Sequence, residues 1–257
     1  MSDKHFAKLK GAKSHDDGCI CKHEDGFKKG DTCSYRFNGW EDAKSGTSLK
    51  GRVKKNWYNW DFREAANKAR LPKMVQEYKL GQKKSASSLL DRDDPRSDEK
   101  AWWLTTGDNF QNAYTPYNHN HHHIMPWTCL KGNLTMTELD LVQAAKYNLN
   151  DKDNMILLPC GQAYGIALKL PDHPYAHASY NDDASDIVNQ LKEAVNVGQA
   201  KHDITVKNSG DFKKLLVDWQ KRQYDKIIDH GEAIVADWLA GNPVPANQIN
   251  ECPIVTA

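Results

Sequence analysis

Five histidines in the middle of this chain have the side chains and spacing for metal binding and proton transfer. The triplet His121-His122-His123 is followed further along by His173 and His177, which lie four residues apart. In an extended strand neighbouring side chains point to opposite faces, so two adjacent histidines cannot do the same work. One can bind a metal ion while the other accepts a proton from water. A solvated polyhistidine loop is the alternative when the triplet is considered alone.

Three segments must position these histidines. The triplet itself is expected in a strand, and residues 153–159 form a short apolar run that Asn154 opens and a proline ends, which is typical of a buried strand. Residues 174–195 begin with a proline, a favoured first-turn residue, and carry apolar side chains at helical spacing. We therefore expect a helix that begins near Pro174 and carries His177 in its first turn. The predicted order is strand, strand, helix.

This order resembles the ββα-metal nucleases, and most closely the AHH family of the HNH/endonuclease VII superfamily. In that family a histidine pair followed by two residues and a proline precedes an Asn-led strand ending in Leu-Pro and a His-x-x-x-His segment. The resemblance covers residues 118–195 and implies an α+β fold in which a ββα-metal element is surrounded by helices. His121 stands where the family has alanine. A register shifted by one residue, with His121 and His122 as the pair in place of His122 and His123, is therefore the alternative.

The resemblance also implies a role for each residue. His122 and His177 would bind the metal, and His123 would be the general base that activates water. His173 would be either a further ligand or a catalytic contact to the scissile phosphate. The side-chain oxygen of Asn154 would accept a hydrogen bond from Nδ1 of His123 and leave Nε2 as the proton acceptor. Taken singly, Asn154 has the alternative of a turn residue, and His173 and His177 that of exposed residues at a helix start.

The implied reaction is phosphodiester hydrolysis. A phosphodiester is anionic and has a poor leaving group, so its hydrolysis needs an activated water and a cation near the leaving oxygen. The resemblance implies a divalent-metal-dependent endonuclease with DNA as the first expectation for the substrate and RNA as the second. Magnesium is the first expectation for the metal, with zinc, nickel or manganese as alternatives because imidazole suits transition metals. A non-catalytic, metal-stapled binding module is the alternative from another functional class.

The AHH family also implies a biological role, since its members are commonly toxin domains. The chain would then be a secreted antibacterial effector, delivered by a component of a specialised secretion apparatus, acting in the target-cell cytoplasm and neutralised in its producer by a cognate immunity protein. A phage or restriction nuclease without toxicity is the alternative. The sequence has no run of 18 apolar residues and no apolar signal-peptide core near its start. We therefore expect no membrane span and no general secretory route.

Basic residues are concentrated in the first hundred residues, which hold 23 basic and 16 acidic side chains, although the whole chain carries only +1. Residues 44–84 alone hold twelve Lys or Arg against three acidic residues, interleaved with aromatic residues. Such a stretch can neutralise phosphates and stack on bases. The residues predicted to bind nucleic acid are Lys50, Arg52, Lys54 and Lys55. A solvated helical face whose aromatic residues belong to the core is the alternative.

Six cysteines are too few to make this chain a disulfide scaffold. Cys19, Cys21, His23 and Cys33 have the side chains for a small zinc site that could staple the N-terminal region, although their spacing is irregular for a zinc motif. One long-range disulfide or free thiols are the alternatives.

The sequence predicts three regions. Residues 1–95 form a small basic region that ends in a charged, linker-like stretch, residues 96–200 contain the nuclease core, and residues 201–257 contain C-terminal helices and an extended tail.

Two further helices are expected around the core. Thr135 and Glu138 have the spacing of a capping box and predict a helix that runs to about Tyr147, between the two strands. Apolar residues between Phe212 and Trp238 recur at helical spacing and predict one long or two shorter helices.

Overall fold

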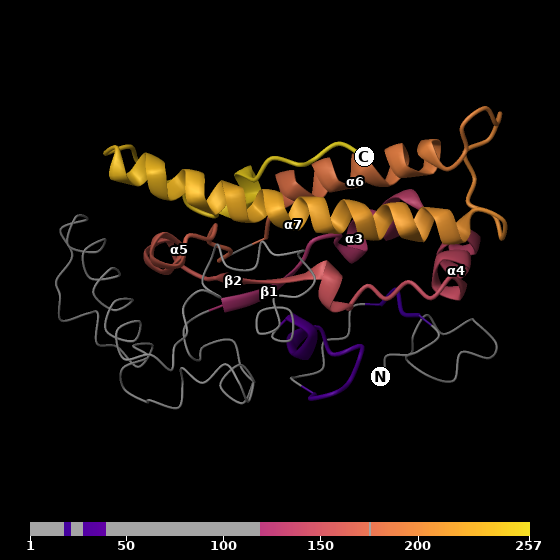
Figure 1. Cartoon of the computed structure of the whole chain (residues 1–257), viewed down its shortest axis with the longest axis horizontal. Coiled ribbons are helices and arrows are strands. Elements are labelled where there is room, and N and C mark those ends of the chain that lie inside the picture. The colour runs from indigo at the N-terminus through magenta and orange to yellow at the C-terminus, as the bar shows by residue number, and fades with distance from the viewer. Residues whose placement is uncertain (1–17, 22–27, 40–118, 175) are drawn as a thin grey trace.

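A two-stranded antiparallel sheet lies in the middle of the computed structural model, between two long helices and an N-terminal segment (Figure 1). The strands are β1 (His119–His123) and β2 (Met155–Pro159), and His122 pairs with Ile156 in their register. Both strands sit where the sequence predicts them. The structure describes residues 18–21, 28–39, 119–174 and 176–257.

Helices connect and cover these strands, so the chain has an α+β architecture. In chain order they are α3 (Trp127–Asn133), α4 (Met136–Ala144), the 3-10 turn η9 (Lys152–Asn154), α5 (Gln162–Leu168), α6 (Ala178–Ala194), α7 (Ser209–Leu239) and the 3-10 turn η10 (Gln248–Glu251). The helices α6 and α7 lie on one side of the sheet (Figure 1). None of the helices in the described residues combines the length and apolar character needed to cross a membrane.

The C-terminal apolar pattern forms one long helix rather than two. A stripe of α7 is buried, and its residues Phe212, Trp219 and Ile227 belong to the same cluster of buried hydrophobic residues as Ile156 and Leu157 of β2. The indole N–H of Trp219 donates to the Val255 carbonyl oxygen at 2.9 Å. The C-terminal region therefore shares a core with the strands that carry the histidines.

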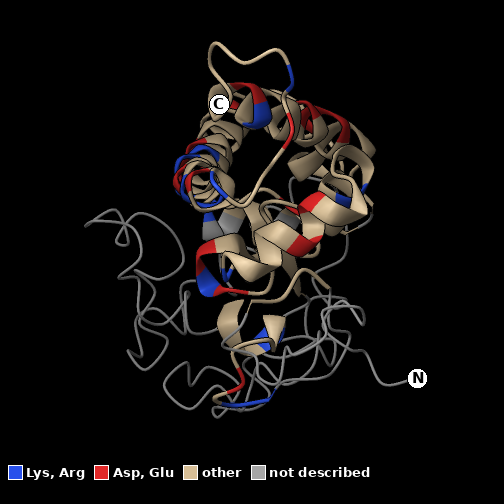
Figure 2. Ribbon diagram, turned by 90° about the vertical axis from the view of Figure 1, so that its right-hand side faces the viewer, with Lys and Arg blue, Asp and Glu red and all other residues tan. Residues whose placement is uncertain are grey.

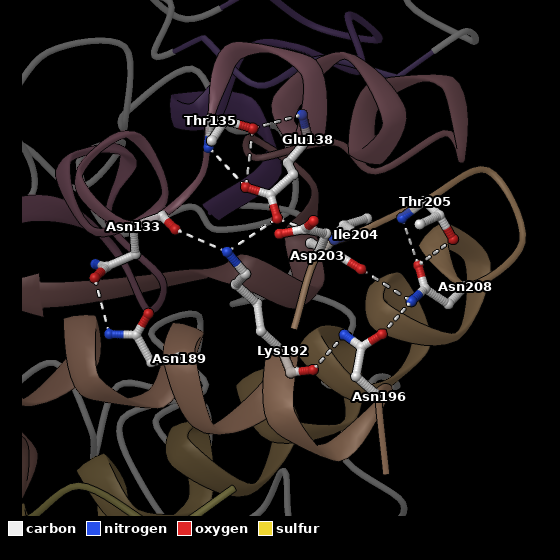
Figure 3. Close-up of polar contacts among 10 residues, drawn as sticks. All are labelled: Asn133, Thr135, Glu138, Asn189, Lys192, Asn196, Asp203, Ile204, Thr205 and Asn208. Carbon is white, nitrogen blue, oxygen red and sulfur yellow. Dashed lines mark hydrogen bonds and ion pairs between the residues drawn. The ribbon is translucent and has the colours of Figure 1, made fainter. Parts of the chain in front are cut away.

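The predicted capping box is present at the start of α4. The side chain of Thr135 accepts from the backbone of Glu138, whose carboxylate accepts in return from the backbone of Thr135. Glu138 is 3% exposed and also accepts from the backbone N–H of Ile204 at 3.0 Å and from Nζ of Lys192 at 2.9 Å. Figure 3 shows this network, which joins α4, α6 and the loop before α7. It links these three elements to one another.

On the other side of the sheet from α6 and α7 lies an N-terminal strap, which we define as residues 18–21 and 28–39 (Figure 1). The backbone of Cys19 donates to the Tyr147 carbonyl at 2.8 Å and accepts from the Leu149 N–H at 2.6 Å. Gly18 has a φ of +90°, and a Cβ there would lie 2.4 Å from the Gln143 carbonyl oxygen. The strap therefore depends on glycine to dock against the loop before β2.

Some predictions lie outside the described residues. The residues predicted to bind nucleic acid are Lys50, Arg52, Lys54 and Lys55. The linker-like boundary is the stretch 91–98, and one of the four expected zinc ligands is His23.

Candidate functional site

Three of the predicted histidines come together beside the sheet. His122 comes from β1, whereas His173 and His177 come from the segment between α5 and α6. Their ligand-capable nitrogens all lie within 4.8 Å of one another, and their ring centroids are 4.7 to 5.0 Å apart. Within the described residues, this is the group of His, Cys, Asp or Glu side chains whose geometry could hold a metal ion. We call these three residues the histidine cluster.

The backbone of His173 is bound to both strands. Its N–H donates to the Pro159 carbonyl at 2.8 Å, and its carbonyl accepts from Nδ2 of Asn120 at 2.8 Å. The thiol of Cys160 donates to the same carbonyl at 3.2 Å. A side chain on β1 and the end of β2 therefore place this residue directly.

The predicted helix start near Pro174 is wrong. The helix α6 begins at Ala178, and His177 is its N-cap, with φ −125° and ψ 73°. A helix through this segment would need the carbonyl of His173 for its own hydrogen bonds, but Asn120 and Cys160 already occupy that carbonyl. His177 therefore reaches the cluster from the residue before the helix rather than from its first turn.

Tyr180 supports the cluster from inside α6 and was not singled out from the sequence. It is fully buried, and its ring lies 4.9 Å from that of His122 and 5.5 Å from that of His177. Its hydroxyl donates to the Ile124 carbonyl at 2.8 Å, just after β1. Because an anchored aromatic ring has few rotamers, Tyr180 restricts where both imidazoles can lie.

His122 has the properties of a metal ligand. It is 1% exposed, and neither of its ring nitrogens has a hydrogen-bond partner among the described residues. Burial lowers the pKa of His122, and the neighbouring His173 and His177 lower it further. A neutral imidazole with an available lone pair is the form that binds metals, so the residues present fit a metal ion.

The opposite face of β1 carries His121 and His123. The ring of Tyr35, from the strap, lies 5.8 Å from the ring of His121 and 5.7 Å from that of His123. The backbone of Gly39 packs against His121, since a Cβ there would lie 2.7 Å from the His121 ring. The shifted register would need His121 as a metal ligand, yet this residue lies away from the cluster.

The expected hydrogen bond between Asn154 and His123 is wrong. Oδ1 of Asn154 accepts from the Met125 N–H at 2.7 Å, and its Nδ2 donates to the carbonyls of Met125 and Leu149 at 3.1 and 2.7 Å. Asn154 thus braces the turn after β1. Asn150 contacts His123 instead, with Oδ1 3.1 Å from Nε2. Because both asparagines are near the start of β2, the sequence alone does not distinguish them.

A cleft of about 490 Å³ is lined by histidines from both faces of β1. Arg36 is the sole Lys or Arg among its described lining residues, and its guanidinium lies 5.3 Å from the centre of the Tyr35 ring. The lining residues are Tyr35, Arg36, Asn120, His121, His122, His123, Pro126, Trp127, Thr128, His173, Pro174, Ala176 and His177. The cleft can therefore hold a metal ion, a proton acceptor and an anionic group together.

Charge on the described helices is mixed. Both acidic and basic residues lie on the helices in Figure 2. Residues 101–257 carry 12 basic and 18 acidic side chains. The excess of basic over acidic residues therefore lies in the first hundred residues of the sequence.

The cysteines of the strap are thiols. Cys19 and Cys33 are buried and Cys21 is partly buried. A hydrogen bond with Cys19, together with burial, raises the pKa of the Cys33 thiol. In the part of the chain that the structure describes, these three cysteines do not form a group with the geometry of a metal site. The zinc site expected from them stays a prediction.

A comparison with protein families agrees with this geometry. Residues 105–216 match the model of AHH, described as a nuclease family of the HNH/ENDO VII superfamily with conserved AHH. The matched residues include both strands, the histidine cluster and α6. No curated protein and no solved structure matches this chain.

Proposed function

We propose that this protein is a metal-dependent endonuclease, because residues 105–216 match the AHH nuclease family of the HNH/ENDO VII superfamily. Its substrate would be DNA in the first place and RNA in the second. The observation that carries the proposal is the histidine cluster beside His123 in one cleft. β1, β2 and α6 would then form the ββα-metal element.

The histidine cluster would hold the metal ion. In this proposal His173 is a third ligand, because its nitrogen lies with those of His122 and His177. Three imidazoles favour zinc, nickel or another transition metal over magnesium, which prefers oxygen ligands. When bound, the ion would supply positive charge for the leaving oxygen of the phosphodiester.

His123 would be the general base. It lies on the opposite face of β1 from His122 and lines the same cleft, so a water there can be within its reach. One ring nitrogen faces Asn150, and the other would accept the proton from water. The guanidinium of Arg36 would bind a phosphate of the substrate, since it carries a fixed positive charge and a planar array of donors.

Cleavage of supercoiled plasmid by the purified protein tests this function. We expect cleavage in the presence of a transition metal, loss of cleavage with a chelator, and loss of cleavage in His122→Leu and His123→Ala. Lys131→Ala is the matched control, because Lys131 is exposed on α3 and lies outside the cleft. Metal binding without cleavage of DNA or RNA would instead favour the metal-stapled binding module.

We further propose that the protein is an antibacterial effector with a cognate immunity protein and a partner in a secretion apparatus. Family analogy alone supports this role. Expression of the wild-type protein in the bacterial cytoplasm should arrest growth, whereas the His123→Ala protein should not. Equal growth of the two strains would favour a phage or restriction nuclease without toxicity.

A further inference from the structure

Asn150 lies between His123 and the N-terminal strap with its whole amide group engaged. It is fully buried, and its Oδ1 lies 3.1 Å from Nε2 of His123. Its Nδ2 donates to the Cys21 carbonyl at 2.8 Å. Its backbone N–H donates to Oδ1 of Asn148 at 3.0 Å, and its carbonyl accepts from Nδ2 of Asn38. The residue is held by groups from both the strap and the loop before β2.

These contacts determine which way the amide points. A backbone carbonyl can only accept hydrogen bonds, so the NH₂ group of Asn150 must face Cys21. Its oxygen then faces His123, and an amide oxygen can only accept. The hydrogen in this contact therefore belongs to Nε2 of His123.

We propose that Asn150 is a positioning residue that holds neutral His123 in the tautomer protonated at Nε2, so that Nδ1 is the atom that accepts the proton from water. This proposal rests on the function proposed above. It reverses the atoms expected from the sequence, where Asn154 was to bind Nδ1 and leave Nε2 as the base. In a neutral imidazole the nitrogen without hydrogen is the basic one, so the hydrogen bond to one nitrogen defines the role of the other.

The strap therefore belongs to the support of the general base. The Cys21 carbonyl is placed by the two backbone hydrogen bonds of Cys19 with Tyr147 and Leu149. These bonds are close along the strap to Gly18, where a side chain would collide with the Gln143 carbonyl. Displacement of the strap would release the Asn150 amide and with it the orientation of His123.

The direct test is the tautomer of His123 by ¹⁵N NMR on the full chain, with the signal assigned by comparison with His123→Gln. We expect a hydrogen on Nε2 and none on Nδ1 in the metal-free wild-type protein. Asn150→Leu removes the acceptor at similar volume, so we expect a mixture of tautomers. Asn150→Asp keeps an oxygen toward Nε2, and we expect it to retain the wild-type tautomer.

Kinetics give the second readout. We expect Asn150→Leu to lower kcat by roughly 10- to 100-fold with little change in KM, because the change affects the base and leaves the substrate contacts in place. Asn150→Asp should recover part of that loss. The affinity for the metal should be unchanged in both variants, since the histidine cluster lies on the other face of β1.

Asn196→Leu is the matched control. Asn196 is 1% exposed, donates to the Lys192 carbonyl at 2.7 Å and accepts from Asn208 at 3.0 Å, so it loses a similar set of buried contacts (Figure 3). It follows the 17-residue helix α6, which places it about 25 Å from His177. We expect it to lower stability and to leave kcat and the His123 tautomer as in the wild type.

A hydrogen on Nδ1 of His123 in the wild-type protein would overturn the proposal, and this result does not depend on the folding of any Asn150 variant. Equal losses of kcat in Asn150→Leu and Asn196→Leu would overturn it as well, because both would then reflect general destabilisation. A wild-type protein that cleaves no nucleic acid would overturn the proposed function, while the NMR measurement would still decide the tautomer.

Discussion

Two buried polar groups of this protein differ in how their atoms are satisfied. Both carboxylate oxygens of Glu138 have partners: one accepts from Thr135, and the other accepts from the Ile204 N–H and from Lys192 (Figure 3). His122 is as deeply buried, yet neither of its ring nitrogens has a hydrogen-bond partner among the described residues. Among the described residues, Glu138 has partners for both of its carboxylate oxygens, whereas the nitrogens of His122 have none and could gain one from a bound metal ion.

This difference separates a structural network from a functional one. Folding alone selects for buried polar atoms that are paired, because an unpaired one costs roughly 1–3 kcal/mol of desolvation. The absence of hydrogen-bond partners for the His122 ring among the described residues is therefore a cost to the metal-free fold. A bound metal ion would offset that cost, which is why the cluster indicates function and the Glu138 network indicates stability.

The largest expected effect is on catalysis, at His123. His123→Ala should lower kcat by roughly 10²- to 10⁴-fold, because a general base contributes about that much. Rates of plasmid cleavage under saturating metal measure it. Thermal unfolding should show a folded protein, and a variant that cleaves at near the wild-type rate would remove His123 from the mechanism.

The next effect is on stability, in the satisfied network. Glu138→Ala should lower the free energy of unfolding by about 2–4 kcal/mol, because it leaves Lys192 and the Ile204 N–H without their buried acceptor. Urea denaturation of the metal-free protein measures this change. The cleavage rate of the folded fraction should remain as in the wild type, and a large loss of kcat would mean that the two groups are not separate.

His122→Leu tests the other buried polar group, which is buried to a similar extent, and the expected change in stability is different. It replaces two unpartnered nitrogens by apolar atoms, so the free energy of unfolding of the metal-free protein should stay the same or rise by up to about 1 kcal/mol. The same denaturation experiment detects it. A loss of unfolding free energy comparable to that of Glu138→Ala would show that His122 is a structural residue. The contrast between the Glu138 network and the histidine cluster would then fail.

The smallest expected effect concerns substrate binding at the edge of the site. Arg36→Gln should reduce the slope of log affinity against log salt by about one, which is the loss of one phosphate contact. Lys29→Gln is the control, because Lys29 is an exposed cation of the strap outside the cleft. Binding would be measured in a His123→Ala background. Neutralising Lys50, Arg52, Lys54 and Lys55 together should reduce the slope further.

Local patterns in the sequence predict much of this architecture. The capping box at Thr135 and the apolar run before Pro159 depend on neighbouring residues, and both form as expected. Local alternation also predicts that His122 and its two histidine neighbours face opposite sides of β1. It leaves the register open, and the structure is what places His122 with His173 and His177.

Contacts between distant segments are what the sequence does not predict. The start of α6 was misplaced because Asn120, 53 residues earlier, occupies the carbonyl of His173. Asn150 was missed because its partner carbonyl on Cys21 lies 129 residues away in the chain. A hydrogen bond between such distant residues leaves no periodic pattern in the sequence, so only the three-dimensional structure identifies it.

Calorimetric titration of a transition metal into the metal-free protein tests the central claim most directly. The histidine cluster predicts one ion bound per chain in the wild-type protein and loss of that binding in His122→Leu, with Glu138→Ala retaining the wild-type affinity. Undiminished binding by His122→Leu would contradict it, because the ion would then lie elsewhere in the chain.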